Sequence, residues 1–182
     1  MADYILTTNK VRFAPTEPEI GDILIEDIAH ALSLMTRANG HFPEFYSVAQ
    51  HCIHCYDEAK ERGYSDRVCL ACLIHDASEA YLADITRPVK RNLPGYLEYE
   101  KVLQDQIYIK FLGSIPTAEE QKLIGSVDDA LLCNEFYHYM GVNLFDEMLP
   151  VKSNPAFCEE PFRIVEERFL EKFEKANFVM VH

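Results

Sequence analysis

Apolar residues recur at helical spacing along most of the chain, and short segments with proline, glycine and polar residues separate them. We predict helices over 26–35, 46–62, 66–79, 96–111, 117–140 and 161–175, joined by loops. Residues 1–19 contain two prolines and are expected to be irregular, apart from a short strand near Tyr4–Leu6. No series of alternating strands follows. The predicted class is therefore all-α, a bundle of about six helices.

The predicted helix 66–79 should lie at the centre of this bundle. Its middle, Val68-Cys-Leu-Ala-Cys-Leu-Ile74, is apolar on every side, so the helix has no face to offer to water. His75 and Asp76 follow directly. A buried carboxylate without a partner is costly, and something must compensate its charge. An internal His–Asp pair would do so as well as a metal ion, and this segment alone does not decide between them.

A second histidine occupies an apolar face in the predicted helix 46–62. At 100° per residue, Val48, Cys52 and Cys55 define the apolar stripe of this helix, and His51 lies within it. His54 falls at the edge of the stripe and is interpreted as an ordinary edge residue.

The predicted helix 117–140 brings carboxylates to its buried face. That face is marked by Ile124, Val127, Leu131 and Leu132. Asp128 falls inside the same arc, whereas Asp129 points outside it. Glu135 lies two turns beyond Asp128 on nearly the same line, where a hydrogen bond to a neighbouring helix or support of a metal ligand is favoured over direct ligation.

Two imidazoles and two carboxylates thus face inward from three predicted helices: His51, His75, Asp76 and Asp128. Mixed nitrogen and oxygen ligation suits one divalent ion such as Mn, Co, Fe, Ni, Zn or Mg. Such an ion lowers the pKa of a bound water and polarises a phosphoryl oxygen. The pattern therefore predicts a buried hydrolytic metal site.

Two Cys-x-x-Cys pairs, Cys52/Cys55 and Cys69/Cys72, raise the alternative of zinc or redox chemistry. Both pairs lie in helix-like apolar segments without the tight turns of zinc knuckles. Residues three apart share a helix face, so we interpret each pair as small core packing.

The formal charge of −13 disfavours binding to duplex nucleic acid, because such proteins normally need a basic surface. A small anionic substrate remains compatible, since a metal ion and a few cations can reverse the sign inside a cleft. No apolar run is long enough for a bilayer, and the first residues do not resemble a signal peptide, so the expected location is cytoplasmic, without membrane attachment. The apolar end Phe178–Val181 is expected to join the core or to form a homodimer contact.

The ordered motifs resemble those of a known family. Tyr46-Ser-Val-Ala-Gln-His51, Leu73-Ile-His-Asp-Ala-Ser-Glu-Ala80 and Val127-Asp128 with Glu135 are similar to the H…HD…D signature of HD-domain phosphohydrolases. The stretch from His75 to Lys90 resembles the group of bacterial 5′-deoxyribonucleotidases and related phage phosphohydrolases. The resemblance covers roughly residues 20–140. One departure is the absence of tryptophan, which the deoxyribonucleotidases place close to the substrate.

The resemblance implies a single HD domain over residues 1–182, with the four metal ligands named above. It also implies that Glu79 acts on the attacking water or the leaving group, and Glu79 would share a helix face with His75 four residues earlier. Asp84 is expected to share this role or to bind the sugar. Arg37 and Lys90 are the expected phosphate or sugar contacts, although either could be an ordinary surface charge.

The function expected from this resemblance is hydrolysis of a phosphate ester in a nucleotide, with a deoxynucleoside 5′-monophosphate favoured. A deoxynucleoside triphosphohydrolase is one alternative, but it would need more cations than the local cluster of Arg87, Lys90 and Arg91. A non-catalytic nucleotide-binding HD module is an alternative from another class, which loss of Glu79 or of a ligand would favour. Neither is lost in this sequence.

Overall fold

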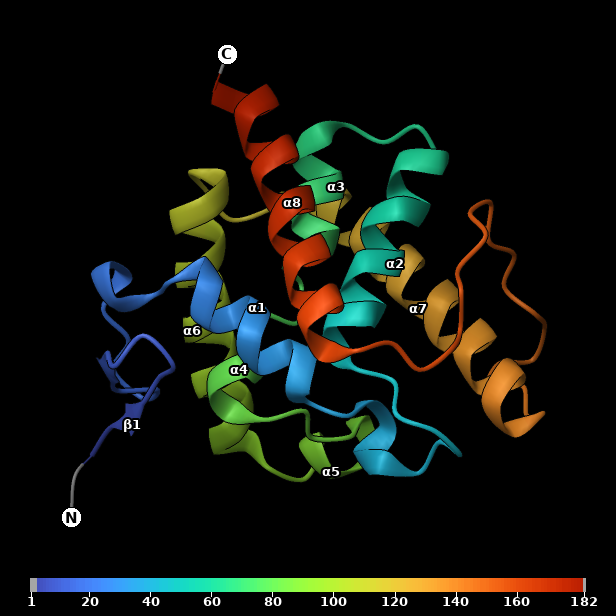
Figure 1. The fold of residues 1–182 in the computed structure, drawn as a ribbon, viewed down its shortest axis with the longest axis horizontal. Coiled ribbons are helices and arrows are strands. Elements are labelled where there is room, and N and C mark those ends of the chain that lie inside the picture. Colours follow the sequence, from blue (N-terminus) through green and yellow to red (C-terminus); the bar gives the residue numbers. More distant parts are fainter. Residues whose placement is uncertain (1–2, 182) are drawn as a thin grey trace.

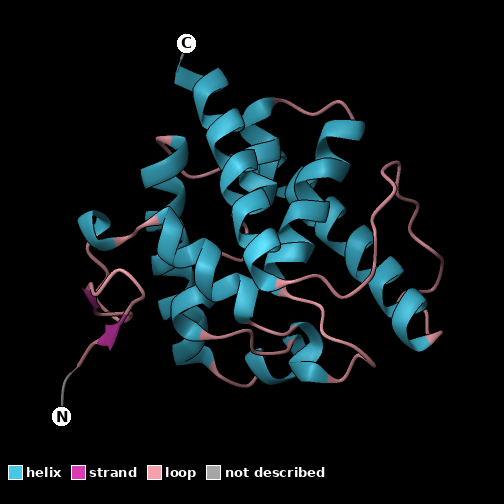
Figure 2. Cartoon of the chain, in the orientation of Figure 1, coloured by secondary structure: helices cyan, strands magenta, loops and turns pink. Residues whose placement is uncertain are grey.

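The computed structural model describes residues 3–181, with side chains described through residue 177. Its helices are α1 (Ile25–Leu34), α2 (Val48–Glu61), α3 (Asp66–Leu73), α4 (Glu79–Leu82), α5 (Arg87–Lys90), α6 (Pro94–Leu112), α7 (Ala118–Met140) and α8 (Phe162–Val181). Two 3-10 turns, η1 (Ile20–Asp22) and η2 (Arg37–Gly40), and a small antiparallel pair, β1 (Ile5–Leu6) and β2 (Arg12–Phe13), complete it. The all-α prediction is confirmed (Figure 2).

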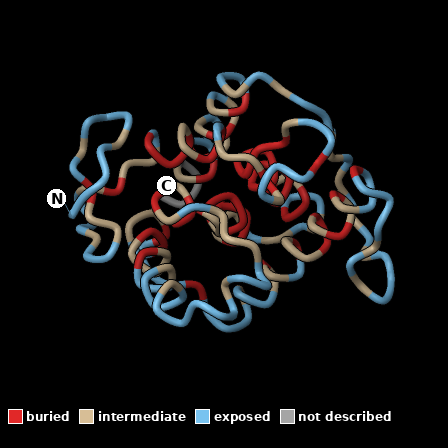
Figure 3. The backbone as a smooth tube through the Cα atoms, turned by 90° about the horizontal axis from the view of Figure 1, so that it is seen from below, coloured by how far each residue is buried: buried red, intermediate tan, exposed pale blue. Residues whose placement is uncertain are grey.

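Helix α3 lies at the centre of the bundle, as its apolar sequence predicts. It packs against α2, α6, α7 and α8, while α1 lies against α2, α4 and α8 (Figure 1). The side chains of α3 from Val68 to Leu73 are buried. Figure 3 shows the buried stretches gathered on the helices, with mostly exposed connections around them. The side chains of Phe178–Val181 lie outside the described residues, so the predicted core or dimer contact of this end stays a prediction.

The predicted helix 66–79 is wrong in its second half. Helix α3 ends at Leu73, because Ile74 leaves the helical conformation with φ −111° and ψ 15°. Residues 74–78 form turns, and α4 begins at Glu79. His75 and Glu79 therefore do not share the face of one helix. The segment after α4, predicted as a loop, contains the single turn α5, and α8 runs on beyond residue 175.

A side chain from another helix forms hydrogen bonds with the backbone at this break. The amide of Gln104, on α6, donates to the carbonyl oxygen of Ile74 at 2.8 Å and accepts from the N–H of Ser78 at 3.1 Å. The Ser78 N–H has no other acceptor among the described residues, whereas the Ile74 carbonyl also accepts from the Ala77 N–H at 3.1 Å. Gln104 thus bridges the turn that carries His75 and Asp76.

Local sequence explains where the other long helices begin and end. Ser47 with Gln50, and Thr117 with Glu120, form complete capping boxes at the starts of α2 and α7. Gly141 ends α7 with φ 66°, a left-handed conformation that a glycine adopts without steric cost. No helix among the described residues is both long and apolar enough to cross a bilayer.

The long connection after α7 is attached to α2 through Glu58, whose side chain is fully buried. Its carboxylate accepts hydrogen bonds from the backbone N–H groups of Lys152 and Ser153, from the Ser153 hydroxyl, and from the Arg62 guanidinium, at 2.7–3.0 Å. Burial alone would raise the pKa of Glu58, but these hydrogen bonds outweigh it and lower the pKa below its usual value.

We expect Glu58→Gln to lower the free energy of unfolding at pH 7 by about 1.5–3 kcal/mol, because a neutral amide replaces a charged acceptor. A depressed folded-state pKa contributes stability above the unfolded pKa of about 4.3, and this contribution is lost as pH falls through the folded value. Urea unfolding between pH 7 and pH 3 should therefore show the difference between wild type and variant shrinking toward acid. Glu61→Gln, at an exposed site of the same helix, is the control. A difference that does not vary with pH would contradict the assignment.

Candidate metal centre

The four predicted ligands come together from three elements: His51 on α2, His75 and Asp76 in the turn after α3, and Asp128 on α7. The Nε2 atoms of His51 and His75 lie 3.3 Å apart. Asp128 Oδ1 lies 3.2 Å from His51 Nε2 and 3.8 Å from His75 Nε2. Asp76 Oδ2 lies 3.4 Å from His75 Nε2 and 3.8 Å from His51 Nε2. Four side chains thus direct one ligand atom each toward a common point.

These separations match the donor spacing around a transition-metal ion. Bonds of about 2.0–2.2 Å at tetrahedral angles place neighbouring nitrogen and oxygen donors about 3.3–3.6 Å apart. Three of the five separations, at 3.2, 3.3 and 3.4 Å, lie at or next to this range, and two are 3.8 Å. The histidines and the partly buried aspartates could therefore hold a metal ion.

The Nδ1 atom of each histidine lies next to a hydrogen-bond acceptor. This contact orients the ring so that its Nε2 atom points toward the centre. His51 Nδ1 lies 2.6 Å from Glu135 Oε1, and His75 Nδ1 lies 2.8 Å from the carbonyl oxygen of Cys72. A carbonyl oxygen cannot donate, so His75 Nδ1 carries a proton, and Nε2 is the nitrogen that would bind a metal ion. Fixing the unused nitrogen in this way is typical of metal-binding histidines.

Glu135 supports the centre from the interior of the bundle. Its side chain is fully buried, and it also accepts a hydrogen bond from the Tyr46 hydroxyl at 3.0 Å. Burial alone would raise the pKa of Glu135, but the positive charges of His51 and Arg37 outweigh it and lower the pKa to about 2. The carboxylate therefore stays ionised and orients His51. This geometry agrees with the expectation that Glu135 supports a metal ligand and does not bind the metal itself.

Asp128 is held by a cation that the sequence analysis did not assign to it. Arg87 donates to Asp128 Oδ2 at 2.6 Å and to Asp129 Oδ1 at 2.9 Å. This fork leaves Asp128 Oδ1 directed at the histidines. Asp129 is the more exposed of the two carboxylates, in line with the helical face predicted for it.

Arg37, predicted as a substrate contact, lies among the ligand atoms themselves. Its guanidinium approaches Asp76 Oδ2 at 3.2 Å, His51 Nε2 at 3.0 Å and Glu135 Oε2 at 3.5 Å. Only 9% of the residue is exposed, so it is not an ordinary surface charge. Arg37 supplies positive charge where buried carboxylates converge.

The backbone next to Arg37 is strained. Ala38, Asn39 and Gly40 are left-handed in succession, with φ of 52°, 51° and 73°. The segment is attached to the start of α2 by a hydrogen bond from the Arg37 N–H to the Tyr46 carbonyl at 2.8 Å. Ala83, directly before Asp84, also has positive φ, at 70°. At residues other than glycine, here Ala38, Asn39 and Ala83, such conformations cost of order 1–3 kcal/mol each and tend to gather at functional sites.

Glu79 is buried beside the centre, with 3% of the residue exposed. Its Oε1 accepts from Lys90 Nζ at 3.1 Å, and its Oε2 has no hydrogen-bond partner among the described residues. Burial, followed by repulsion from Asp76 and Asp84, raises the pKa of Glu79 well above its usual value, against the attraction of Lys90. Glu79 is therefore suited to carry a proton near neutral pH.

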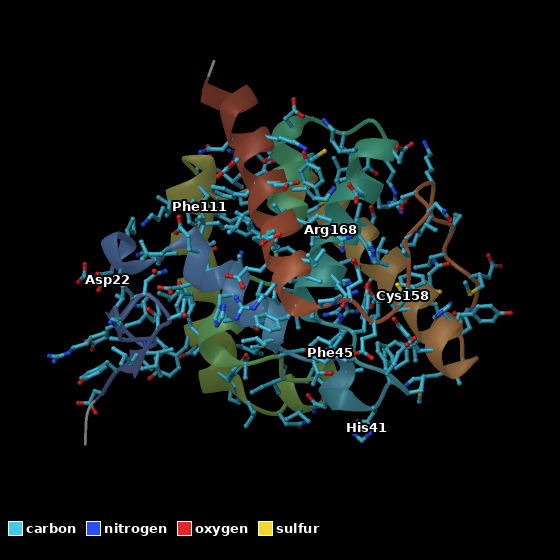
Figure 4. The ribbon with its side chains drawn as sticks, viewed as in Figure 1. Asp22, His41, Phe45, Phe111, Cys158 and Arg168 are labelled. Atoms are coloured by element: carbon cyan, nitrogen blue, oxygen red, sulfur yellow. The ribbon has the colours of Figure 1, made fainter. Side chains whose placement is uncertain are left out.

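Asp84 and Lys90 complete the predicted set, and neither is fully exposed. Burial is the main cause that raises the pKa of Asp84. Lys90 is shared between Glu79 and Glu100, whose Oε1 lies 2.5 Å from the ammonium. The predicted phosphate contact of Lys90 would therefore compete with the Glu100 carboxylate. His41, which follows η2, lies exposed at the lower edge of the molecule, away from the helical core (Figure 4).

All six cysteines are free, and Cys52, Cys55, Cys69 and Cys72 are buried, as core packing predicts. Two of them also border the metal centre. Cys55 Sγ lies 3.5 Å from His51 Nε2, and the ligand atoms of His51, Cys55 and His75 lie within 4.8 Å of one another. A second such group joins Cys52, His75 and Asp76. The sequence interpretation did not anticipate this proximity.

A separate cavity of about 520 Å³ lies between α2, residues 152–156 and α8. Asp57, Lys60, Lys152 and Arg168 are among its lining residues, and Arg168 reaches from α8 toward α2 (Figure 4). None of the four predicted ligands lines it. The candidate metal centre is therefore distinct from this cavity.

Gln104→Leu is expected to destabilise the protein by about 1–3 kcal/mol, because the Ser78 N–H loses its acceptor while the Ile74 carbonyl keeps its hydrogen bond from the Ala77 N–H. It should also weaken metal affinity by about 10- to 100-fold, as loss of a supporting contact typically does, because the turn holding His75 and Asp76 loosens. Thermal unfolding and metal titration of the purified variant measure both effects. Gln121→Leu, on α7, is the control. Unchanged metal affinity in a destabilised Gln104→Leu protein would limit Gln104 to a folding role.

Comparison with curated proteins finds two relatives, both without an assigned function. The uncharacterized protein YfdR of Escherichia coli is 41% identical over 90 residues, which cover 50% of this chain and 48% of the relative. An uncharacterized protein of Rhodobacter capsulatus is 36% identical over 119 residues, covering 62% of this chain and 60% of the relative. The chain thus spans about half to three fifths of the length of these relatives. No family model matches the chain.

Proposed function

We propose that this protein hydrolyses a phosphate ester in a nucleotide in a metal-dependent reaction, with a deoxynucleoside 5′-monophosphate as the favoured substrate. The observation that carries the proposal is the convergence of His51 Nε2, His75 Nε2, Asp76 Oδ2 and Asp128 Oδ1, with separations of 3.2–3.8 Å. When bound there, a divalent ion would lower the pKa of water and polarise a phosphoryl oxygen. The resemblance of the motifs to HD-domain phosphohydrolases supports the choice of reaction.

The remaining residues of the site have separable roles in this proposal. Glu79, whose pKa is raised by burial and by the nearby Asp76 and Asp84, donates a proton to the leaving oxygen of the nucleoside. Arg37 neutralises the carboxylates and offers N–H donors to the phosphoryl oxygens. Asp84 lies at the strained turn after α4, where it would accept a hydrogen bond from the sugar or assist Glu79.

The charges favour a monophosphate over a triphosphate. A triphosphohydrolase must neutralise the additional phosphates with local cations. Arg87 is bound to Asp128 and Asp129, and Lys90 to Glu100, so two of the three cations in the local cluster are already paired. The triphosphate reaction remains the second candidate within the same chemistry.

A screen of nucleotides with the metal-loaded protein tests the proposal. Deoxynucleoside and ribonucleoside mono- and triphosphates are each supplied with Mn²⁺, Co²⁺, Mg²⁺, Ni²⁺ or Zn²⁺, and released phosphate and triphosphate are measured separately. The expected result is release of inorganic phosphate from monophosphates. Release of triphosphate would establish the second candidate. Nucleotide binding without hydrolysis under every metal would overturn the proposal and leave a nucleotide-binding module.

A further inference from the structure

A cysteine sulfur, that of Cys55, borders the candidate centre, and the proposed hydrolysis assigns no role to it. His51 and Cys55 lie four residues apart on α2, so both side chains project from the same helix face. Both are buried, at 0% and 1% exposure. The Cys55 sulfur lies 3.5 Å from His51 Nε2, the atom that is directed at the metal position.

This separation fits joint coordination of one ion. A zinc-like ion binds nitrogen at about 2.0–2.1 Å and sulfur at about 2.3 Å, so a tetrahedral angle places the two donors about 3.5–3.6 Å apart. The observed Sγ–Nε2 distance of 3.5 Å meets this requirement, and the His51–His75 distance of 3.3 Å meets the corresponding one for two nitrogens. A weak hydrogen bond between the Cys55 thiol and the His51 imidazole has a similar length. The experiment below therefore distinguishes a metal ligand from a hydrogen-bonded thiol.

We propose that Cys55 is a metal ligand for thiophilic ions, which bind through His51, Cys55 and His75 together with one aspartate oxygen. Hard ions such as Mg²⁺ and Mn²⁺ would use the oxygen side formed by Asp76 and Asp128 instead. Coordination replaces the thiol proton, which passes to solvent. This inference rests on the metal centre of the proposed function and assigns it a selectivity for Zn²⁺, Co²⁺ and Cd²⁺.

Cobalt binding to the full-length protein tests the assignment without an assay of activity. One equivalent of Co²⁺ added to the apoprotein should produce a near-ultraviolet thiolate-to-cobalt charge-transfer band. Cys55→Ser should lose this band while keeping the weaker visible bands of bound cobalt. Cys69→Ser, a buried thiol of α3 that belongs to neither metal-binding group, is the matched control and should keep the band.

X-ray absorption of the cobalt-loaded wild type covers the case in which Cys55→Ser does not fold. One sulfur at about 2.3 Å supports the proposal, and a shell of only nitrogen and oxygen overturns it. A charge-transfer band that persists in Cys55→Ser but disappears in Cys52→Ser also overturns it, because the ligand would then be Cys52.

The same samples distinguish this inference from the proposed function. If cobalt binds without a charge-transfer band and the protein hydrolyses nucleotides, the proposal of a sulfur ligand is wrong and the proposed hydrolase function stands. A clear band in a protein that hydrolyses no nucleotide supports the sulfur ligand and removes the hydrolase. Absence of any bound metal removes both.

Discussion

His75→Ala and Asp76→Ala are each expected to abolish metal binding and hydrolysis. Each substitution deletes one of four converging donors, in a turn that backbone groups and Gln104 hold in place. Loss of a contact that merely supports a ligand typically costs 10- to 100-fold, so loss of the ligand itself should exceed about 100-fold in metal affinity. Metal analysis of dialysed protein, with circular dichroism to confirm the fold, measures the effect.

The neighbouring aspartates of α7 provide the control for this prediction. Asp128→Asn should weaken the metal strongly, because Oδ1 lies 3.2 Å from His51 Nε2. Asp129→Asn should have a smaller effect, limited to its ion pair with Arg87. Full metal occupancy in both alanine variants would refute the centre. An inactive Asp129→Asn protein beside an active Asp128→Asn protein would show that the wrong aspartate was chosen.

Glu79→Gln is expected to keep the metal and the fold but to slow hydrolysis by about 100- to 10,000-fold, the usual contribution of a general acid or base. The amide preserves the size of the side chain and removes the proton that a carboxylic acid can transfer. Burial and the nearby carboxylates raise the pKa of Glu79, which favours the protonated form that a general acid needs. Single-turnover hydrolysis by the metal-loaded variant measures the chemical step directly.

Glu100→Gln is the matched control, since Glu100 is the other partner of the Lys90 ammonium. If the effect of Glu79→Gln arose only from an altered Lys90 charge environment, Glu100→Gln should slow the reaction similarly. A Glu79→Gln rate within about threefold of wild type, far below the contribution expected of a general acid, would make Glu79 structural and pass the role to Asp84 or to the metal ion alone.

Periodicity along the chain was sufficient to predict the long helices and most of the faces that they bury. The α3 segment is apolar on all sides, and burial is the only stable solution for such a helix. The same reasoning placed His51 and Asp128 on inward faces, because a residue's direction on a regular helix follows from its position. Asp128 was separated from Asp129 on this ground, and the structure directs Asp128 toward the histidines.

Tertiary contacts decided where that regularity fails. Helix α3 ends at Leu73 although the sequence continues to favour a helix, and Gln104 from α6 accepts a hydrogen bond from the Ser78 N–H within the resulting turn. His54 was predicted at the edge of α2, yet it is buried, because the connection after α7 covers that side and places Phe157 against its ring. Helical periodicity predicts neither the contact of Gln104 with this turn nor the contact of Phe157 with His54.

The charges inside the candidate centre were likewise determined by long-range packing. Arg37 enters it from the segment before α2, and Glu135 meets His51 from a position 84 residues away. Helical periodicity specifies which way a side chain points, and it cannot specify which distant side chain it meets. The pairing of buried charges depends on that meeting, because a carboxylate or imidazole in the interior is stable only beside its partner.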